Sequence, residues 1–328
     1  MRRGHIRHGS LQFYPRKRAE KILPNANWDF ISEKRKDASL LGFIGYKAGM
    51  KSAYVKDDTP NSMTKGKRII IPVTIIECPP LKILSVRIYK HGKIIAEALN
   101  ENLDKELQSK IKLPKQKKKT IADVLKNAEE KSEDSEVRVV VYSVVKKTGI
   151  KKTPDIIEIG LSGSLSDKIN FIKQNLAKEI SIKDFLTSEF MKEGVIDIRG
   201  VTKGKGFQGS TKRFGLDLLP HKTEKGIRGS GSGGPWHPAR VEFRQPFAGQ
   251  MGFFTRVVYN SKIIFVGDSK ERNINVAAGF SHFGTVRDNY IIVYGSVQGP
   301  VKRQLLLTVP LRAAKKHIKK KFEFVELR

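Results

Sequence analysis

The run LLGFIGYKAGMKSAYV (residues 40–55) opens the part of the chain that decides its fold. We interpret it as two short strands around a glycine-containing bend. It is followed by RIIIPVTIIE (68–77) and LKILSVRIY (81–89), which are rich in β-branched residues and are separated by the breaker Pro79-Pro80. Pro72 has no amide hydrogen, which places its strand at an edge or a bulge. Short strands at this spacing predict an antiparallel barrel.

Strand-like runs of the same kind recur along the chain. They are VRVVVYSVV (137–145), DIIEIGL (155–161), GVIDIRGV (194–201), RVVYN (256–260), KIIFVG (262–267), NYIIVYG (289–295) and KRQLLLTV (302–309). We therefore expect a mainly β fold with an α+β insertion, built on an antiparallel closed β-barrel. Its parts are expected in residues 39–96, 137–198 and 257–312.

Residues 97–136 interrupt the strand pattern and predict an inserted helical lobe. EALNENLDKEL (97–107) places leucines four residues apart, as on one face of a helix, and Thr120 and Asp123 form a capping-box pattern that opens a second helix. The run KQKKK (115–119) either contacts phosphate or forms a solvated loop, and we favour the loop.

Two further helices are expected before residue 194. Ser166 or Asp167 is a candidate N-cap for DKINFIKQNLAKE (167–179). Ser181 and Asp184 form a second capping box, and Gly194 supplies a C-terminal stop for the helix that they open.

The net charge limits the partners of the chain. Its 328 residues include 63 Lys or Arg and 33 Asp or Glu, a net charge of +30, which repels itself unless a polyanion neutralises it. Nucleic acid, an anionic membrane and acidic proteins are the candidates. No apolar run reaches membrane-spanning length, and the basic segments are broken by glycine rather than amphipathic, so we expect no membrane partner. The single Cys78 excludes an internal disulfide, and we expect a cytoplasmic, nucleic-acid-bound protein.

The most basic glycine-rich stretch is residues 199–256, which we call the central arm. Its 58 residues contain 12 glycines, 11 Lys or Arg and three acids, and they show no apolar period. Such a stretch buries too little carbon to offset the entropy of ordering its backbone, so we expect it to fold on a polyanion. Trp236, between Pro235 and His237, would be its rigid aromatic tip. The alternative is a disordered basic linker, but linkers rarely carry so many large aromatic residues.

The motif VTKGKGFQG (201–209) has a physical use in such an arm. Its glycines let the backbone lie close to a sugar-phosphate chain and allow positive φ angles, while Lys203 and Lys205 alternate with them. Phe207 and Phe214 either stack on bases or anchor the loop, and we expect at least one of them to be an anchor.

The two ends of the chain are also basic. Residues 1–38 are expected to form an extended N-terminal arm in which Phe13 and Tyr14, beside Arg16 to Arg18, stack on bases. The alternative is a solvated, frayed terminus. The end, residues 313–328, is interpreted as a basic tail that binds polyanions loosely.

No catalytic or cofactor motif is complete. GKGFQG (204–209) has the G-x-G-x-x-G spacing, but the helix and the acidic residue of a dinucleotide site do not follow it. The seven histidines are scattered without metal-ligand spacing. We therefore expect no enzyme activity, no cofactor, no metal and no small-molecule substrate.

The ordered motifs resemble one known family, the universal large-subunit ribosomal protein L-three in its archaeal and eukaryotic form. The resemblance runs nearly end to end. It rests on RHGSLQFYPRKRA, LLGFIGYKAGM, VTIIECPPLKILSVRIY, GVTKGKGFQGSTKRFG, GPWHPARV, GQMGFFTRVVYN and VRDNYIIVYGSVQGPVKRQLLL, in family order. The lobe at 97–136 is similar to that of archaeal and eukaryotic members.

The resemblance implies a structural constituent of the large ribosomal subunit. It implies a barrel like that of other translation proteins, extensions threaded into the large-subunit rRNA, early assembly, contacts with neighbouring large-subunit proteins, and a central arm that reaches toward the peptidyl transferase centre. The family's tryptophan finger would be Trp236, with His237 beside it.

Charge pattern and resemblance together predict two sets of rRNA-contacting residues. The predicted cations are Arg16, Lys17, Arg18, Lys203, Lys205, Lys212, Arg213, Lys222, Lys225, Arg228, Arg240, Arg244 and Arg256. The predicted sites of close backbone approach are Gly204, Gly206, Gly209, Gly233 and Gly234. Two rival hypotheses are an RNA-modifying enzyme, which would need a nucleophile and base that the arm lacks, and an RNA chaperone without a stable barrel.

Overall fold

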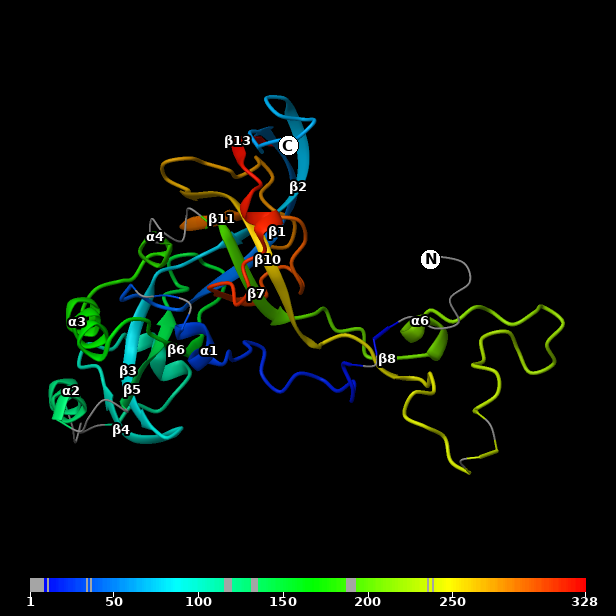
Figure 1. Cartoon of the computed structure of the whole chain (residues 1–328), viewed down its shortest axis with the longest axis horizontal. Helices are drawn as coiled ribbons and strands as arrows, with labels where there is room; N and C mark the ends of the chain where they lie inside the picture. Colours follow the sequence, from blue (N-terminus) through cyan, green and yellow to red (C-terminus); the bar gives the residue numbers. More distant parts are fainter. Residues whose placement is uncertain are drawn as a thin grey trace. The chain divides into compact units, whose positions relative to one another are not determined.

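The chain divides into two compact units, each built from two separate stretches. A computed structural model describes residues 9–10, 12–33, 35, 37–114, 120–130, 135–186, 193–234, 236–237 and 239–328. Unit 1 consists of Met1–Ile22 and Val201–Arg256, and unit 2 of Leu23–Gly200 and Val257–Arg328 (Figure 1). The run KQKKK (115–119) lies outside the described residues.

A seven-stranded sheet dominates unit 2. The strands follow the order β12-β7-β10-β11-β2-β1-β13, and β12 also pairs with β1. The registers described for this sheet are all antiparallel. The strands are β1 (Gly42–Asp57), β2 (Arg68–Glu77), β7 (Val195–Val201), β10 (Thr255–Asp268), β11 (Asn289–Tyr294), β12 (Gln304–Thr308) and β13 (Phe322–Leu327). The prediction of a mainly β fold is confirmed.

β1 is one long strand, so the prediction of two short strands around a bend is wrong. Its pairing with β2 shifts register between Lys47 and Gly49, and the ladder continues on both sides of this bulge. The bulge absorbs the bend without ending the strand. On its other edge, β1 pairs first with β12, beginning at Gly42↔Thr308, and then with β13, ending at Asp57↔Phe322.

Proline 72 lies in β2 where the sheet changes its pairing. β11 pairs with β2 from Tyr290↔Glu77 to Tyr294↔Val73, so this ladder stops at the residue next to Pro72. On the other side, Pro72 is paired with Ser52 of β1. A residue without an amide hydrogen is tolerated there because the β11 ladder ends at this point. The predicted edge-like position therefore agrees with the pairing.

A second sheet corrects the expectation that all strands belong to one barrel. It has four antiparallel strands in the order β4-β3-β5-β6. β3 pairs with β5 from Leu81↔Ser143 to Lys90↔Ser135, whereas β2 pairs with β1 and β11, so the chain changes sheet at Pro79-Pro80. The strands are β3 (Leu81–Lys90), β4 (Lys93–Leu99), β5 (Ser135–Ser143) and β6 (Ile156–Gly160).

The helix expected over 97–107 does not form. The chain continues as β4 to Leu99 and then forms a short 3-10 helix, η1 (Lys105–Ser109). The Asn100 side chain donates to the carbonyl oxygens of Ile83 and Leu176, at 3.0 and 2.8 Å, and holds the chain in a turn. Leu107 is buried in a small cluster against the second sheet, so the leucine spacing reflects packing rather than helical periodicity.

The other three predicted helices exist, with shifted ends. They are α2 (Ile121–Glu130), capped by Thr120 and Asp123, α3 (Leu165–Asn175) and α4 (Ile182–Phe185), which follows the predicted Ser181–Asp184 capping box. Ser164 caps α3, rather than Ser166 or Asp167, because Asp167 is the third helical residue and completes its capping box. α4 ends at Phe185, well before the expected stop at Gly194.

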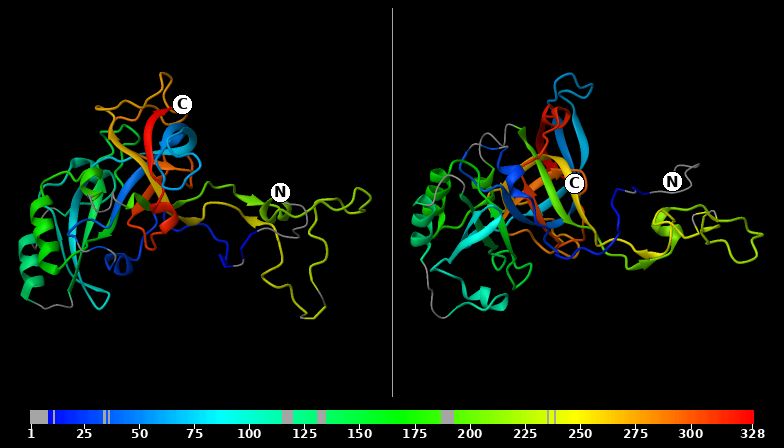
Figure 2. Two further views of the ribbon diagram at one scale, coloured as in Figure 1. Left: turned by 45° about the horizontal axis from the view of Figure 1, so that its top comes forward. Right: turned by 60° about the horizontal axis from the view of Figure 1, so that its bottom comes forward.

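Two larger buried clusters, besides the small one around Leu107, form the core of unit 2. The larger one joins β1, β7 and β12 to the second sheet and to helices α2 and α3, which lie along that sheet (Figure 2). The smaller one gathers side chains of β1, β2, β10 and β11 with Phe280 and Phe283. A folded core of this size does not fit a chaperone without stable tertiary structure.

Two segments that were expected to form extensions, residues 23–38 and 313–328, belong to the folded part of unit 2. Trp28 lies in α1 (Trp28–Ser32) and is 3% exposed in the larger core, so the N-terminal segment after Ile22 belongs to unit 2. The C-terminal stretch interpreted as a loose tail forms α7 (Lys315–Ile318) and β13, which extends the seven-stranded sheet. Backbone pairing with β1 explains this order, and charge composition alone does not reveal it.

Candidate nucleic-acid interface

The central arm begins and ends in an antiparallel stem, which we define as residues 202–208 and 249–254. Lys205 N donates to Met251 O at 3.0 Å, Met251 N donates to Gly206 O at 2.9 Å, and Thr202 N donates to Phe254 O at 2.9 Å. The stem continues as β8 (Phe207–Gln208) paired with β9 (Gly249–Gln250). Part of the arm therefore has its own backbone hydrogen bonds.

The two segments of the stem approach each other most closely at one glycine, Gly252. Gly252 has φ +72°, and a Cβ added to it would lie 2.1 Å from the carbonyl oxygen of Lys203. The backbone cannot retreat from this contact without breaking the stem, so the position excludes any side chain. The sequence alone does not point to Gly252, because it is one of 12 glycines in the arm and nothing local distinguishes it.

A short helix follows the first strand of the stem, and one of its arginines connects it to the returning segment of the arm. Gly215, with φ +64°, ends α6 (Ser210–Phe214) in a left-handed conformation. Phe214 is buried, whereas Phe207 is exposed, so one of the two phenylalanines anchors the arm as expected. Arg213 donates from Nε to Gln250 O and from a terminal nitrogen to Phe247 O, both at 3.0 Å. Burial, and then the nearby Arg16, lowers the pKa of Arg213.

The N-terminal segment packs on the arm, which contradicts the expectation of an independent extended arm. Ala19 N donates to Phe253 O at 2.8 Å. The Arg16 guanidinium lies 4.5 Å from the centre of the Phe214 ring, and Tyr14 meets Phe243 edge-on with ring centres 5.6 Å apart. Aromatic and cation–π contacts of this kind connect segments about 200 residues apart, and no local pattern announces them.

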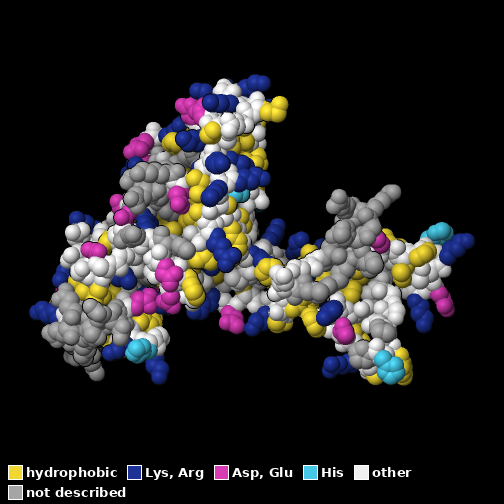
Figure 3. Space-filling view, viewed as in Figure 1, with side chains coloured by type: hydrophobic (Ala, Val, Ile, Leu, Met, Phe, Trp, Pro, Cys, Tyr) yellow, Lys and Arg dark blue, Asp and Glu magenta, His cyan; other side chains and the backbone are white. Residues whose placement is uncertain are grey.

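The predicted cations fall into two groups. Arg16, Arg213 and Arg256 are half-buried and lie over aromatic rings of unit 1. The others are exposed: Lys17, Arg18, Lys203, Lys205, Lys212, Lys222, Lys225, Arg228, Arg240 and Arg244. Figure 3 shows separate lysine and arginine side chains on the visible face of unit 1. Among the described residues, the ion pairs of unit 1 are Lys17–Glu20 at 3.5 Å and Arg244–Glu242 at 4.0 Å. Most of the exposed cations therefore have no acidic partner within this part of the chain.

The predicted glycines differ from Gly252 in what surrounds them. A Cβ on Gly206, Gly209 or Gly234 would meet nothing within 4 Å, and one on Gly204 or Gly233 would make only ordinary contacts. Positive φ explains the choice of glycine at Gly206 and Gly234. At the other three positions, no steric contact within the described residues requires glycine.

The two tryptophans have opposite environments. Trp236 is 83% exposed, and His237 beside it is exposed as well, whereas Trp28 is buried. A large aromatic ring left in water is costly to the free chain, so its position is typical of a side chain that contacts a partner. Trp236 is therefore not a core residue.

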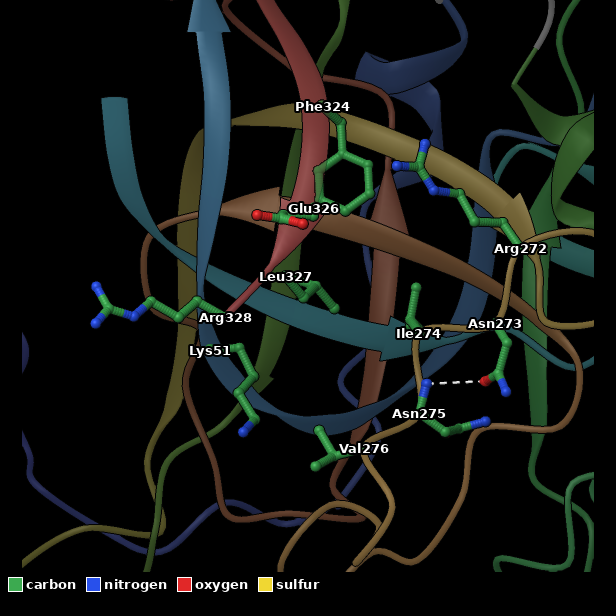
Figure 4. Close-up of a pocket in the computed structure, with 10 residues that line it drawn as sticks. All are labelled: Lys51, Arg272, Asn273, Ile274, Asn275, Val276, Phe324, Glu326, Leu327 and Arg328. Atoms are coloured by element: carbon green, nitrogen blue, oxygen red, sulfur yellow. Dashed lines mark hydrogen bonds between the residues drawn. The ribbon is translucent and has the colours of Figure 1, made fainter. Parts of the chain in front are cut away.

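A pocket of about 260 Å³ in unit 2 lacks catalytic chemistry. Lys51 and residues 272–276 face residues of β13 across it (Figure 4). Asn275 N donates to Asn273 Oδ1 at 2.9 Å, and the only carboxylate among the described lining side chains, Glu326, forms an ion pair with Arg68. Among the described residues there is no group of three metal-ligating side chains, and no helix is long and apolar enough to span a membrane.

The carboxyl group of Glu77 is buried in unit 2. Burial raises the pKa of Glu77 to about 7, although the amides of Arg287 and Asp288 donate to its Oε1 at 2.7 and 3.1 Å. The adjacent Cys78 thiol is fully buried, and burial raises its pKa as well. A raised pKa without an open cleft is a property of the core rather than of an active site.

Comparison with known proteins identifies the family. The family described as Ribosomal protein L3 matches residues 1–327. The chain belongs to the ribosomal protein L3 family. The large ribosomal subunit protein uL3 of Archaeoglobus fulgidus is 42% identical over 321 residues, covering 95% of this chain and 93% of the relative. That of Methanocaldococcus jannaschii is 39% identical over 323 residues, covering 95% and 93%.

Family membership settles the general role of the chain. As an L3 protein, it is a structural protein of the large ribosomal subunit, and it sits in the ribosome as part of a ribonucleoprotein. The family predicted from the sequence motifs is confirmed. The names of the family and of these relatives describe a structural ribosomal protein rather than an enzyme, which also confirms the expected absence of enzyme activity.

Proposed function

We propose that this L3 protein binds large-subunit rRNA through unit 1. The observation that carries the proposal is the set of exposed lysines and arginines on the central arm, most of them without an acidic partner among the described residues. Phosphate groups would supply the missing negative charge, and the counterions that they release would favour binding. The half-buried Arg16, Arg213 and Arg256 support the arm internally, so we assign them mainly to its shape.

The glycines support a close approach of RNA to the backbone. At Gly204 and Gly233 the described residues leave room for a side chain, so we attribute the choice of glycine there to a partner of the chain, whereas Gly209 is also the N-cap of α6. A sugar-phosphate backbone lying against Gly204 and Gly233 would be such a partner.

We propose that Trp236 is the tip that reaches toward the peptidyl transferase centre, as the family resemblance implies. Its exposure supports a contact with RNA bases, because every base offers a face on which an indole can stack. Early assembly and contacts with neighbouring large-subunit proteins belong to the same proposal.

We also infer that the seven-stranded sheet of unit 2 closes into a barrel. β12 lies at one end of the strand order and pairs with β1 near the other end over five residue pairs. Such a closure would remove two open sheet edges.

Lysine substitutions in the stem test the proposed rRNA contact. We expect the Lys203→Gln, Lys205→Gln double variant to bind purified large-subunit rRNA more weakly. The slope of log K against log salt should become shallower by roughly 0.7–0.9 for each phosphate that the variant no longer neutralises. A Lys93→Gln, Lys105→Gln variant removes two exposed lysines of unit 2 and is the control. Equal slopes for the stem variant and the unsubstituted chain would contradict the proposal.

Substitution of the two tryptophans separates RNA contact from core packing. We expect Trp236→Ala to change the free energy of unfolding by less than about 0.5 kcal/mol, and Trp28→Ala to lower it by about 3–5 kcal/mol. Urea denaturation measures both. Large subunits carrying Trp236→Ala should show altered peptidyl transfer or A-site tRNA binding. If Trp236→Ala lowered the stability as much as Trp28→Ala, the Trp236 ring would be a core residue, and the proposal that it is an RNA-contacting tip would be refuted.

A further inference from the structure

Unit 2 has a strongly basic surface of its own, formed by two segments far apart in the chain. We define the α7 surface as residues 58–67, the β1–β2 loop, together with residues 315–321. These 17 residues contain seven lysines and a single acid, Asp58. Figure 3 shows lysine and arginine side chains gathered over the part of unit 2 where β13 and the β1–β2 loop lie in Figure 1.

Reciprocal hydrogen bonds join the two segments. Asp58 N donates to Lys321 O at 3.0 Å, and Lys321 N donates to Thr59 Oγ1 at 3.1 Å. From β10, the side chain of Asn260 donates to Arg312 O and accepts from Ala314 N, at 2.9 and 3.0 Å. The segment that carries five of the seven lysines is therefore a fixed part of the fold rather than a loose tail.

The β1–β2 loop is also held in one shape. Asp57 is buried and accepts hydrogen bonds from Thr59 N at 2.9 Å and from Ser62 Oγ at 2.8 Å. The loop presents Met63 at 97% exposure between these anchors and Lys65. A long apolar side chain on a fixed loop, beside cations, suits contact with a base or insertion into a minor groove.

Burial and the lysines of the α7 surface lower the pKa of neighbouring basic groups. Burial, and then the ammonium groups of Lys320, Lys316 and Lys262, lowers the pKa of His317. Burial, and then Lys321, likewise lowers the pKa of Lys262. Lys65, Lys67, Lys315, Lys316, Lys319 and Lys321 are exposed, and none of them forms an ion pair with a described residue.

We propose that the α7 surface is a second RNA-binding site, which contacts phosphates through its lysines and a base or groove through Met63. It uses no residue of unit 1 and so goes beyond the function proposed above. RNA fits better than an acidic protein because the chain lies in a ribonucleoprotein and the lysines flank an exposed methionine on two joined segments. Two sites on one chain would also raise the affinity of each for a shared RNA through effective concentration.

The test uses the full chain with Lys65, Lys67, Lys319 and Lys321 all replaced by Gln. The matched control replaces four exposed lysines in and after β4: Lys93, Lys105, Lys110 and Lys112. With purified large-subunit rRNA, we expect the salt slope of the test variant to become shallower by about 3, at roughly 0.7–0.9 per neutralised phosphate, and that of the control to stay near the unsubstituted value. An unchanged slope in the test variant, or equal changes in both variants, overturns the proposal.

A crosslink identifies the partner directly. Photocrosslinking from p-benzoyl-phenylalanine placed at Met63, in assembled large subunits, should yield an RNA adduct. A crosslink to protein alone would assign the surface to a protein neighbour and refute the RNA site. The stem variant Lys203→Gln, Lys205→Gln tests RNA binding by unit 1 separately. The proposal for the α7 surface can therefore be refuted without affecting the proposal for unit 1, and the reverse is also true.

Discussion

Asp155→Ala is expected to lower the free energy of unfolding by about 3 kcal/mol, because it removes the carboxylate that binds the buried Tyr46 hydroxyl and two half-buried side chains, those of Gln304 and Lys151. Asp155 Oδ2 accepts the hydroxyl of the fully buried Tyr46 at 2.5 Å, and Oδ1 accepts from Gln304 Nε2 at 3.3 Å. Lys151 forms an ion pair with the same carboxylate. Burial, and then the Asp155 carboxylate, raises the pKa of Tyr46 well above its usual range, so the tyrosine remains a donor.

Two substitutions sharpen this test. Asp155→Asn keeps an oxygen acceptor for Tyr46 but removes the ion pair, and we expect a destabilisation of about 1 kcal/mol. Asp217→Ala removes an exposed acid of unit 1 and should change the free energy of unfolding by less than about 0.5 kcal/mol. Urea denaturation of the three variants gives the ranking. If Asp155→Ala were as stable as Asp217→Ala, the polar network would not join the two sheets of unit 2.

The second large effect is expected at the stem of the central arm. Gly252→Ala should lower the local stability of the stem by roughly 3 kcal/mol, because alanine is strained at φ +72° and its Cβ would meet the Lys203 carbonyl. Hydrogen exchange at the Lys205 and Met251 amides should speed up by about a hundredfold. The cause is local, so unfolding of unit 2 should be unaffected.

Gly204→Ala is the matched control for the stem. Its Cβ would lie 3.7 Å from the nearest described atom, in Phe253, which is an ordinary contact. We expect amide exchange in the stem to be unchanged and rRNA affinity to fall, because the proposed backbone approach would be blocked. Equal exchange rates for Gly252→Ala and Gly204→Ala would show that the close contact at Gly252 is not structurally important.

Strand positions could be predicted from the sequence because they depend on local composition. The β-branched runs at 68–77 and 81–89 coincide with β2 and β3 to within one residue at each end. Which sheet each strand joins could not be predicted, because this depends on pairing between distant segments, as in β3 with β5. The helix predicted over 97–107 was wrong for a related reason. A leucine spacing of four fits a helix, but these side chains pack against the second sheet, which is formed by distant segments.

In the candidate interface, too, local features could be predicted from the sequence, and contacts between distant segments could not. The exposed lysines and the exposed Trp236 could be chosen from the sequence, because charged residues and an aromatic residue outside any apolar pattern can be recognised there. The internal roles of Arg16 and Arg213 could not, because a guanidinium over a ring from another segment has no sequence signature. For the same reason, the packing of the N-terminal segment on the arm could not be foreseen. Direct rRNA contact by these residues remains a prediction.

The three partners of β1 set an order for folding during synthesis. β1 leaves the ribosomal tunnel early and can pair with β2 soon afterwards. Its other edge must wait for β12 and β13, which are made after all the other described strands. Until then, β1, a strand of 16 residues, has an unpaired edge in the nascent chain that other chains can join. Completion of the sheet is therefore a late, long-range step, and a nascent chain of this kind would depend on cellular protection.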